Sequence, residues 1–306
     1  MRRYPLVRLI PVFLFGIFLL VGCDQPRDEQ IAGLILAAGA QIFSSQEAAV
    51  DPDTPRQAFA HIENYAVYYG QGQGEALAQF DAVIIQPETL ETADLLTLTN
   101  SGTLALAYLS IGEVEPTRAW YTDGRVLPAW ILGENPNWGS SYIDANAAGW
   151  QDLMVDVAGQ YLAQGFNGIF LDTIDTVDVY PSIRPGMITL IQRLRETFPN
   201  AILVQNRGFS VMDETASLVD GIMIESLTTS YDFATTTYIP VPSGTYDDLI
   251  QQLQQLHQET GLVVLALDYA APGDAETAQI ARQAAQSYGF ISAVSEITLQ
   301  QVPSAE

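Results

Sequence analysis

Eight short apolar runs, separated by segments of helical periodicity, constrain the fold of this chain more than any other feature. The runs are rich in Val, Ile, Leu and Tyr, and turn or capping residues follow each one. They span residues 65–69, 82–86, 104–110, 169–172, 202–205, 221–225, 262–268 and 290–294. Eight strands that alternate with helices over about 250 residues are typical of a (β/α)8 TIM barrel, whereas a doubly wound sheet more often has fewer strands. We therefore predict a single α/β barrel domain.

The segments between these runs carry apolar side chains at helical spacing. The clearest stripe consists of Trp150, Leu153, Met154, Val157 and Tyr161. Gly165 is expected to end this helix, because glycine readily adopts the left-handed conformation found at helix C-termini. Further helices are predicted over 188–198 and 249–256, and a last helix is predicted to begin at an N-cap, Asp274. The predicted apolar positions of that last helix are Ile280, Ala284 and Tyr288.

The N-terminus reads as a targeting segment. Arginines precede a long apolar run that stops at Cys23, the only cysteine of the chain. A small residue directly before a cysteine resembles a bacterial lipobox, so we predict a lipoprotein signal peptide at 1–22, a lipidated Cys23 with a tether over 23–57, and the barrel over 58–306. The alternative is a transmembrane anchor with an incidental cysteine. Either reading predicts a cell-envelope protein, held on the outer side of a bacterial membrane.

Charge narrows the class of partner. The chain has 36 acidic and 12 basic residues, all of the latter arginine, and a formal net charge of −24. A polyanion would be repelled, so nucleic acid is not expected as a partner, and a cationic partner is favoured electrostatically. The acidity is explained equally well by solubility or adaptation to salt. We expect a monomer. We also expect no cofactor, since the glycine-rich run at 70–74 is followed by Glu75 and fails the dinucleotide-binding pattern.

A barrel places its functional residues just after the C-terminal ends of its strands. Those positions carry many acids and almost no histidine, and no G-x-S-x-G segment occurs, so a histidine zinc site and a Ser-His-Asp triad are disfavoured. Asp172, Asp175 and Asp178 could hold a divalent cation through oxygen ligands, but their spacing is not that of an EF-hand. The remaining chemistry is that of paired carboxylates.

Asp172 and Glu225 are the expected catalytic pair, because each directly ends an apolar run. Glycoside hydrolysis needs one carboxylic acid that protonates the leaving oxygen and one carboxylate that attacks or activates water. The alternative is that such acids only cap helices or accept backbone hydrogen bonds. The residues expected to contact substrate are Tyr69, Tyr108, Glu113, Trp138, Asp175, Asn206, Asp268 and Tyr269, since polar groups and flat rings suit sugars.

Segments at several of these positions together resemble glycoside hydrolase family 114, the endo-α-1,4-polygalactosaminidase-like barrels. The matching segments are Tyr108–Glu113, Asn137–Ser140 with Ile143-Asp144, Gly165–Asp175, Gln205-Asn206 and Ile224–Ser226. Asn167 stands where aspartate is commoner in the family motif. The resemblance covers residues 60 to 295.

The resemblance implies an endo-acting, retaining glycosidase that cleaves an α-1,4-linked galactosamine exopolysaccharide, with Asp172 as nucleophile and Glu225 as acid/base. Protonated galactosamine is cationic, which is compatible with the acidic chain. Two alternatives stay open at this point. One is a non-catalytic surface lipoprotein that binds polysaccharide, and the other is a hydrolase of a different glycan.

Overall fold

The computed structural model describes residues 54–303. The predicted signal peptide, Cys23 and nearly all of the predicted tether lie outside these residues. Within the described part, no helix is both long enough and apolar enough to cross a membrane.

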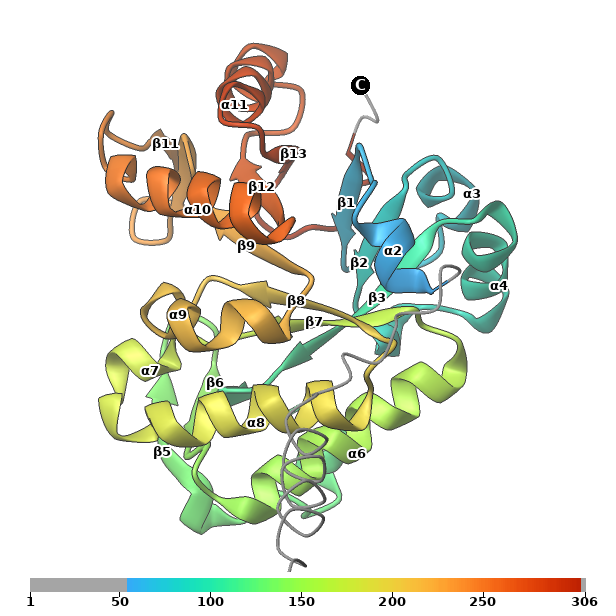
Figure 1. Ribbon diagram of the computed structural model, residues 1–306, viewed down its shortest axis with the longest axis vertical. Coiled ribbons are helices and arrows are strands. Elements are labelled where there is room, and N and C mark those ends of the chain that lie inside the picture. The colour runs from blue at the N-terminus through green and yellow to red at the C-terminus, as the bar shows by residue number, and fades with distance from the viewer. Residues whose placement is uncertain (1–53, 304–306) are drawn as a thin grey trace, which may run out of the picture. The chain divides into compact units, whose positions relative to one another are not determined.

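Eight parallel strands form one sheet that almost closes into a barrel, and helices cover its outer side (Figure 1). In sheet order they are β1 (Tyr65–Tyr68), β2 (Ala82–Ile85), β3 (Leu104–Ser110), β7 (Gly168–Asp172), β8 (Ile202–Asn206), β9 (Gly221–Glu225), β12 (Val263–Tyr269) and β13 (Ile291–Ser295). Every predicted strand is present, with ends within one residue of the expected ones. The (β/α)8 barrel is therefore confirmed.

The helices include the four predicted from periodicity and several that were not predicted. They are α3 (Gly74–Leu77), α4 (Thr92–Ser101), α5 (Ala119–Thr122), α6 (Ala148–Gln164), α7 (Thr176–Val179), α8 (Arg184–Thr197), α9 (Met212–Thr215), α10 (Asp247–Thr260) and α11 (Ala275–Ser287). Helix α6 ends at Gly165 with φ 112°, and Asp274 caps α11 by accepting from the backbone N–H of Thr277. The apolar face predicted for α11 was wrong at Ile280, which is 55% exposed, whereas Tyr288 is partly buried against the core as expected. The fully buried residues of the helix are Ala281 and Ala285. The two alanines let the helix approach the sheet closely.

Alternate residues of each strand fall into two separate buried clusters. Leu106 and Phe170 belong to the cluster inside the barrel. Ala105 and Ile169 belong to the cluster that also contains the helix residues packed on the outside. This alternation follows from the two-residue period of a strand. It also decides which side chains at a strand's C-terminal end face the barrel mouth.

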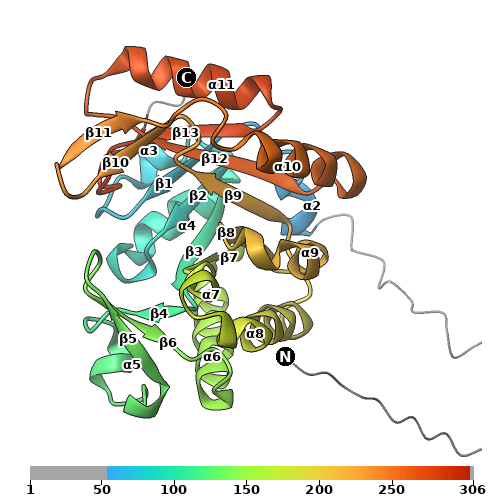
Figure 2. The ribbon, with the colours of Figure 1, turned by 90° about the vertical axis from the view of Figure 1, so that its left-hand side faces the viewer.

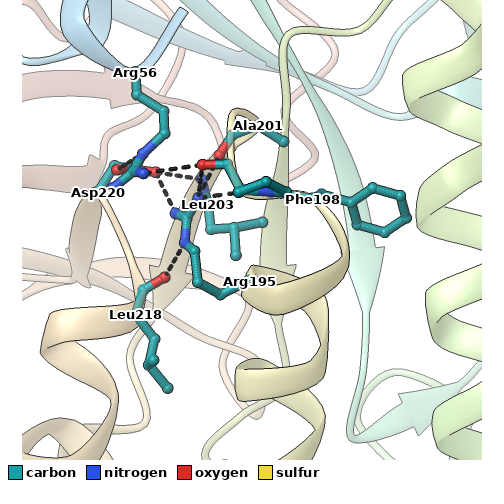
Figure 3. A network of polar contacts seen from close by, with 8 residues as sticks. Arg56, Arg195, Phe198, Ala201, Leu203, Leu218 and Asp220 are labelled. Atoms are coloured by element: carbon teal, nitrogen blue, oxygen red, sulfur yellow. Dashed lines mark hydrogen bonds and ion pairs between the residues drawn. The ribbon is translucent and has the colours of Figure 1, made fainter. Parts of the chain in front are cut away.

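The barrel begins earlier than predicted. Helix α2 (Pro55–Phe59) inserts Phe59, 1% exposed, into the cluster inside the barrel, beside Gly221 at the start of β9. Arg56 and Arg195 both pair with the carboxylate of Asp220, at 2.7 and 2.6 Å, and Figure 3 shows the two guanidinium groups converging on it. Residues 55–57, expected in the tether, are thus bound to the N-terminal end of the barrel by apolar packing and ion pairs.

Two insertions at the C-terminal side of the strands were not predicted. A three-stranded antiparallel sheet, β4 (Glu113–Val114), β5 (Ile131–Asn135) and β6 (Ser140–Ile143), lies between β3 and α6. A hairpin of β10 (Thr229–Asp232) and β11 (Thr237–Pro240) follows β9. Figure 2 shows both insertions on the same side of the barrel. They therefore flank the end at which functional residues are expected.

Candidate active site

A single amide group connects the two predicted catalytic carboxylates. Asp172 ends β7, Glu225 ends β9, and Asn206 ends β8, which lies between them in the sheet. The Nδ2 of Asn206 donates to Oδ1 of Asp172 at 2.8 Å and to Oε1 of Glu225 at 2.6 Å. These two oxygens are therefore no farther apart than the sum of the two distances, about 5.4 Å.

The backbone turns sharply immediately after each of these three strand ends. Thr173, Arg207 and Ser226 all have left-handed backbones, with φ of 61°, 52° and 57°. Such a conformation costs a residue other than glycine roughly 1–2 kcal/mol. At Thr173 hydrogen bonds offset part of this cost, because its hydroxyl accepts from Gly112 N–H and lies 2.8 Å from the Ser110 hydroxyl. Backbone strain of this kind concentrates at functional sites.

Two tyrosines complete the hydrogen bonds of the carboxylates. Tyr108 donates to Oδ2 of Asp172 at 2.7 Å, and Tyr269 donates to Oε2 of Glu225 at 2.9 Å. Burial, followed by the nearby carboxylate charge, raises the pKa of both phenols well above the usual tyrosine value. Both tyrosines therefore remain protonated donors, and both carboxylates are fixed in orientation.

The environment of Glu225 favours its protonated form. Burial raises the pKa of Glu225, and the negative charge of Asp172 raises it further. Hydrogen bonds from Asn206 and Tyr269 act in the opposite direction, but the pKa remains above its ordinary value. The surroundings of Glu225 therefore suit a proton donor.

These groups lie in a pocket of about 740 Å³ at the C-terminal end of the strands. This volume falls within the roughly 300–1,000 Å³ usual for ligand sites. The residues predicted from the sequence that line it are Tyr69, Tyr108, Glu113, Trp138, Asp172, Asp175, Asn206, Glu225 and Tyr269. The fold thus brings together nine of the ten residues expected to act on or contact substrate.

Asp268 is the exception, and the structure corrects its assignment to the substrate site. It is fully buried, it does not line the pocket, and its Oδ1 accepts from the backbone N–H groups of Thr228 and Thr229 at 2.7 and 2.9 Å. Asp268 neighbours Tyr269 on β12, and adjacent strand residues point to opposite faces. Asp268 therefore faces outward with Ala266 and holds the segment that leads into the β10–β11 hairpin.

Glu113 and Asp175 are further acids of the pocket, and each has a specific partner. Asn135 donates to both oxygens of Glu113 at 3.2 Å, and Ser140 donates to one of them. Burial raises the pKa of Glu113. Asp175 pairs with Arg207 at 3.2 Å, and burial raises the pKa of Asp175 while the arginine lowers it.

Several residues of the pocket lining were not among those expected from the sequence to contact substrate. Asn135 and Ser140 come from the unpredicted small sheet, and Tyr231 and Phe233 come from the unpredicted hairpin. The Thr, Tyr and Ile residues of Thr229–Asp232 and Thr237–Pro240, two short segments separated by four residues, were a weak signal for that hairpin. Arg207 follows Asn206 directly and is itself a strand-end residue, but it was not selected as a substrate contact.

The divalent-cation alternative does not fit the geometry. Within residues 54–303, no group of three or more histidine, cysteine, aspartate or glutamate side chains is placed to hold a metal ion. Asp175 is instead paired with Arg207, and Asp178 is exposed and lies outside the pocket lining.

Comparisons with solved structures agree with this architecture. The glycoside hydrolase domain of PelA from Pseudomonas aeruginosa is 26% identical, with a TM-score of 0.72 over 80% of this chain and 98% of that one. Ega3 from Aspergillus fumigatus, solved in complex with galactosamine, is 13% identical, with a TM-score of 0.61 over 78% of this chain and 92% of that one. At that lower identity the likeness to Ega3 shows the fold alone.

Sequence comparisons extend the similarity over almost the whole chain. An uncharacterized protein of Deinococcus radiodurans is 26% identical over 310 residues, which is 94% of this chain and 97% of that protein. A family model described as glycoside-hydrolase family GH114 matches residues 44–305. With the barrel, the paired carboxylates and this match in hand, the chain is a glycoside hydrolase and belongs to family GH114.

Proposed function

We propose that this protein is a retaining endo-glycosidase that cleaves α-1,4-linked galactosamine polysaccharide, with Asp172 as nucleophile and Glu225 as acid/base. The observation that carries the mechanism is the amide of Asn206 shared by the two carboxylates. The two oxygens that accept hydrogen bonds from this amide, Oδ1 of Asp172 and Oε1 of Glu225, therefore lie within about 5.4 Å of each other. Retaining glycosidases separate their carboxyl groups by about 5–5.5 Å, whereas inverting ones need about 6.5–9.5 Å to admit a water molecule.

The two carboxyl groups would act in two steps. In the first, an oxygen of Asp172 bonds to the anomeric carbon while the bond to the leaving oxygen breaks, and Glu225 gives its proton to that oxygen. In the second, Glu225 takes a proton from water, the water oxygen bonds to the anomeric carbon, and Asp172 is released. The raised pKa of Glu225 suits a group that must begin the cycle protonated.

The charge of the pocket favours a cationic sugar. Its lining holds five acidic side chains and one arginine, Arg207, which is itself paired with Asp175. An amino sugar without its acetyl group carries a positive charge at neutral pH and would be attracted to such a lining. The galactosamine bound to Ega3 is consistent with this substrate class.

The test compares wild type with Asp172→Asn and Glu225→Gln on de-N-acetylated galactosaminan. Asp178→Asn is a matched control, because it makes the same change at an exposed position outside the pocket. We expect new reducing ends from wild type and the control, and a loss of about 10³-fold or more in the two pocket variants. Short-chain products would indicate endo action, and NMR of the first product would give its anomeric configuration. Equal rates in wild type and both pocket variants would refute the assignment, and a panel of other glycans would reveal a different substrate.

We further propose that the protein works at the cell envelope as a monomer anchored through a lipidated Cys23. The proposed lipid anchor rests on the lipobox-like sequence that ends at Cys23. Cys23→Ala should release the protein from the membrane fraction, and light scattering of the barrel should give the mass of one chain. Membrane association unchanged in Cys23→Ala would contradict the lipid anchor.

A further inference from the structure

Two large aromatic side chains remain exposed at the edge of the pocket. Trp138, in the turn between β5 and β6, is 62% exposed, and Phe233, at the tip of the β10–β11 hairpin, is 44% exposed. Both line the pocket, and their rings meet edge to face with centroids 5.1 Å apart. The two unpredicted insertions therefore touch each other through these rings.

The exposed rings are held in fixed positions. Phe233 packs edge to face against Tyr231 at 5.2 Å, and Tyr231 packs in the same way against Tyr238 at 5.0 Å. The hydroxyl of Tyr238 accepts a hydrogen bond from the backbone N–H of Ile297, which follows β13. A chain of four aromatic rings thus runs from the barrel wall to Trp138. Little side-chain entropy would be lost when a ligand settles on rings that are already ordered.

Stability does not explain this exposure. Exposed large apolar side chains that gather at one place usually mark a binding surface, whereas single ones need no explanation. Among the described residues, three of the eight exposed large apolar side chains line this pocket, namely Trp138, Val179 and Phe233. The other five are outside its lining. These exposed apolar side chains therefore line the same pocket as Asp172 and Glu225.

We propose that Trp138 and Phe233 form a separate sugar-binding subsite at the pocket rim, which holds a hexopyranose unit of the polymer away from the bond being cleaved. A pyranose ring presents an apolar face of C–H groups that packs on an aromatic ring, and its edge hydroxyls remain in water. The inference rests on the proposed function as far as the substrate is a polysaccharide. The subsite contributes to the binding of long polysaccharide chains and takes no part in breaking the glycosidic bond.

The test measures retention of the protein in gels that contain polysaccharide, in an Asp172→Asn background so that the polymer is not cut. Trp138→Ala and Phe233→Ala are compared with Leu132→Ala and Ile239→Ala. The control residues are also exposed apolar side chains of β5 and β11, but they do not line the pocket. De-N-acetylated galactosaminan is the first polymer, followed by its N-acetylated form and a panel of neutral polysaccharides.

We expect each aromatic variant to weaken retention by about two- to tenfold, with no change in the controls. The double variant should lose less than the product of the single losses, because the two rings contact each other. When the same aromatic substitutions are made in the active protein, which keeps Asp172, KM for the polymer should rise. KM for the shortest cleaved oligosaccharide should stay unchanged. Retention unaltered in both aromatic variants, or no retention of the Asp172→Asn protein on any polymer, would overturn the subsite. Failure of the proposed function would look different: the protein that keeps Asp172 would be retained by the polymer but would release no reducing ends.

Discussion

Asp172 and Glu225 accept hydrogen bonds from one and the same nitrogen, the Nδ2 of Asn206. The two bonds fix the spacing of the carboxylates and use both hydrogens that the amide can donate. The amide oxygen of Asn206, Oδ1, is buried and has no hydrogen-bond partner among residues 54–303. Because three neighbouring strands each supply one of these residues, the spacing is built into the sheet and does not depend on a mobile loop.

Removal of this amide should impair catalysis more than folding. For Asn206→Ala we expect kcat to fall about 10- to 100-fold, since each carboxylate loses a charge-assisted hydrogen bond. The pKa of Glu225 should rise further, because the bond from Asn206 lowers it. The alkaline limb of the pH–rate profile should therefore move to higher pH. An unchanged pH profile would show that Asn206 does not act on the pair.

Glu225 should reduce stability at neutral pH. Its pKa in the folded protein is raised above the ordinary glutamate value of 4.5, so the folded state binds its proton more tightly than the unfolded state. Stability from this group is complete below pH 4.5 and is lost as the pH rises through the folded pKa. We therefore expect Glu225→Gln to melt at a higher temperature than wild type at pH 7, and the difference to shrink at pH 4. A lower melting temperature for the variant at pH 7 would contradict this view.

The two tyrosines should affect the pH–rate profile differently. Tyr269→Phe removes a hydrogen bond that lowers the pKa of Glu225, so the alkaline limb of the profile should move to higher pH. Tyr108→Phe removes the bond to Asp172 and should lower kcat with a smaller effect on that limb. Both changes keep the ring, which preserves packing. Rates measured from pH 4 to 9 distinguish these outcomes, and identical profiles for the two variants would count against separate roles.

Asp220 should matter for stability alone. Its side chain is 10% exposed and holds Arg56, Arg195 and the backbone N–H of Leu203 at the N-terminal end of the barrel. Asp220→Ala leaves two guanidinium groups without their carboxylate, and we expect a loss of about 2–4 kcal/mol in unfolding free energy. Urea unfolding measures this loss, and Asp220→Asn should lose less. Activity per folded molecule should match wild type, since this end of a barrel contributes to stability.

Local patterns in the sequence predicted most of the fold. Each strand is an apolar run of suitable length, and the stripe ending at Gly165 specified α6, because both signals depend only on neighbouring residues. The position of Asp172 and Glu225 at strand ends followed from the same patterns. The sequence also contained the information that Asp268 and Tyr269 cannot both belong to the pocket, because the two residues are adjacent on one strand and point to opposite faces.

The sequence by itself determined the barrel, the end that carries function and the acids at that end. Only the tertiary structure decided the shared amide of Asn206, because it depends on the placement of β7, β8 and β9 side by side. It likewise decided the contact between Trp138 and Phe233, which lie about a hundred residues apart in two insertions with weak local signals. The physical reason is that periodicity reports which face a residue takes on its own element. Distances between elements arise only when sheet closure and loop packing bring distant segments together.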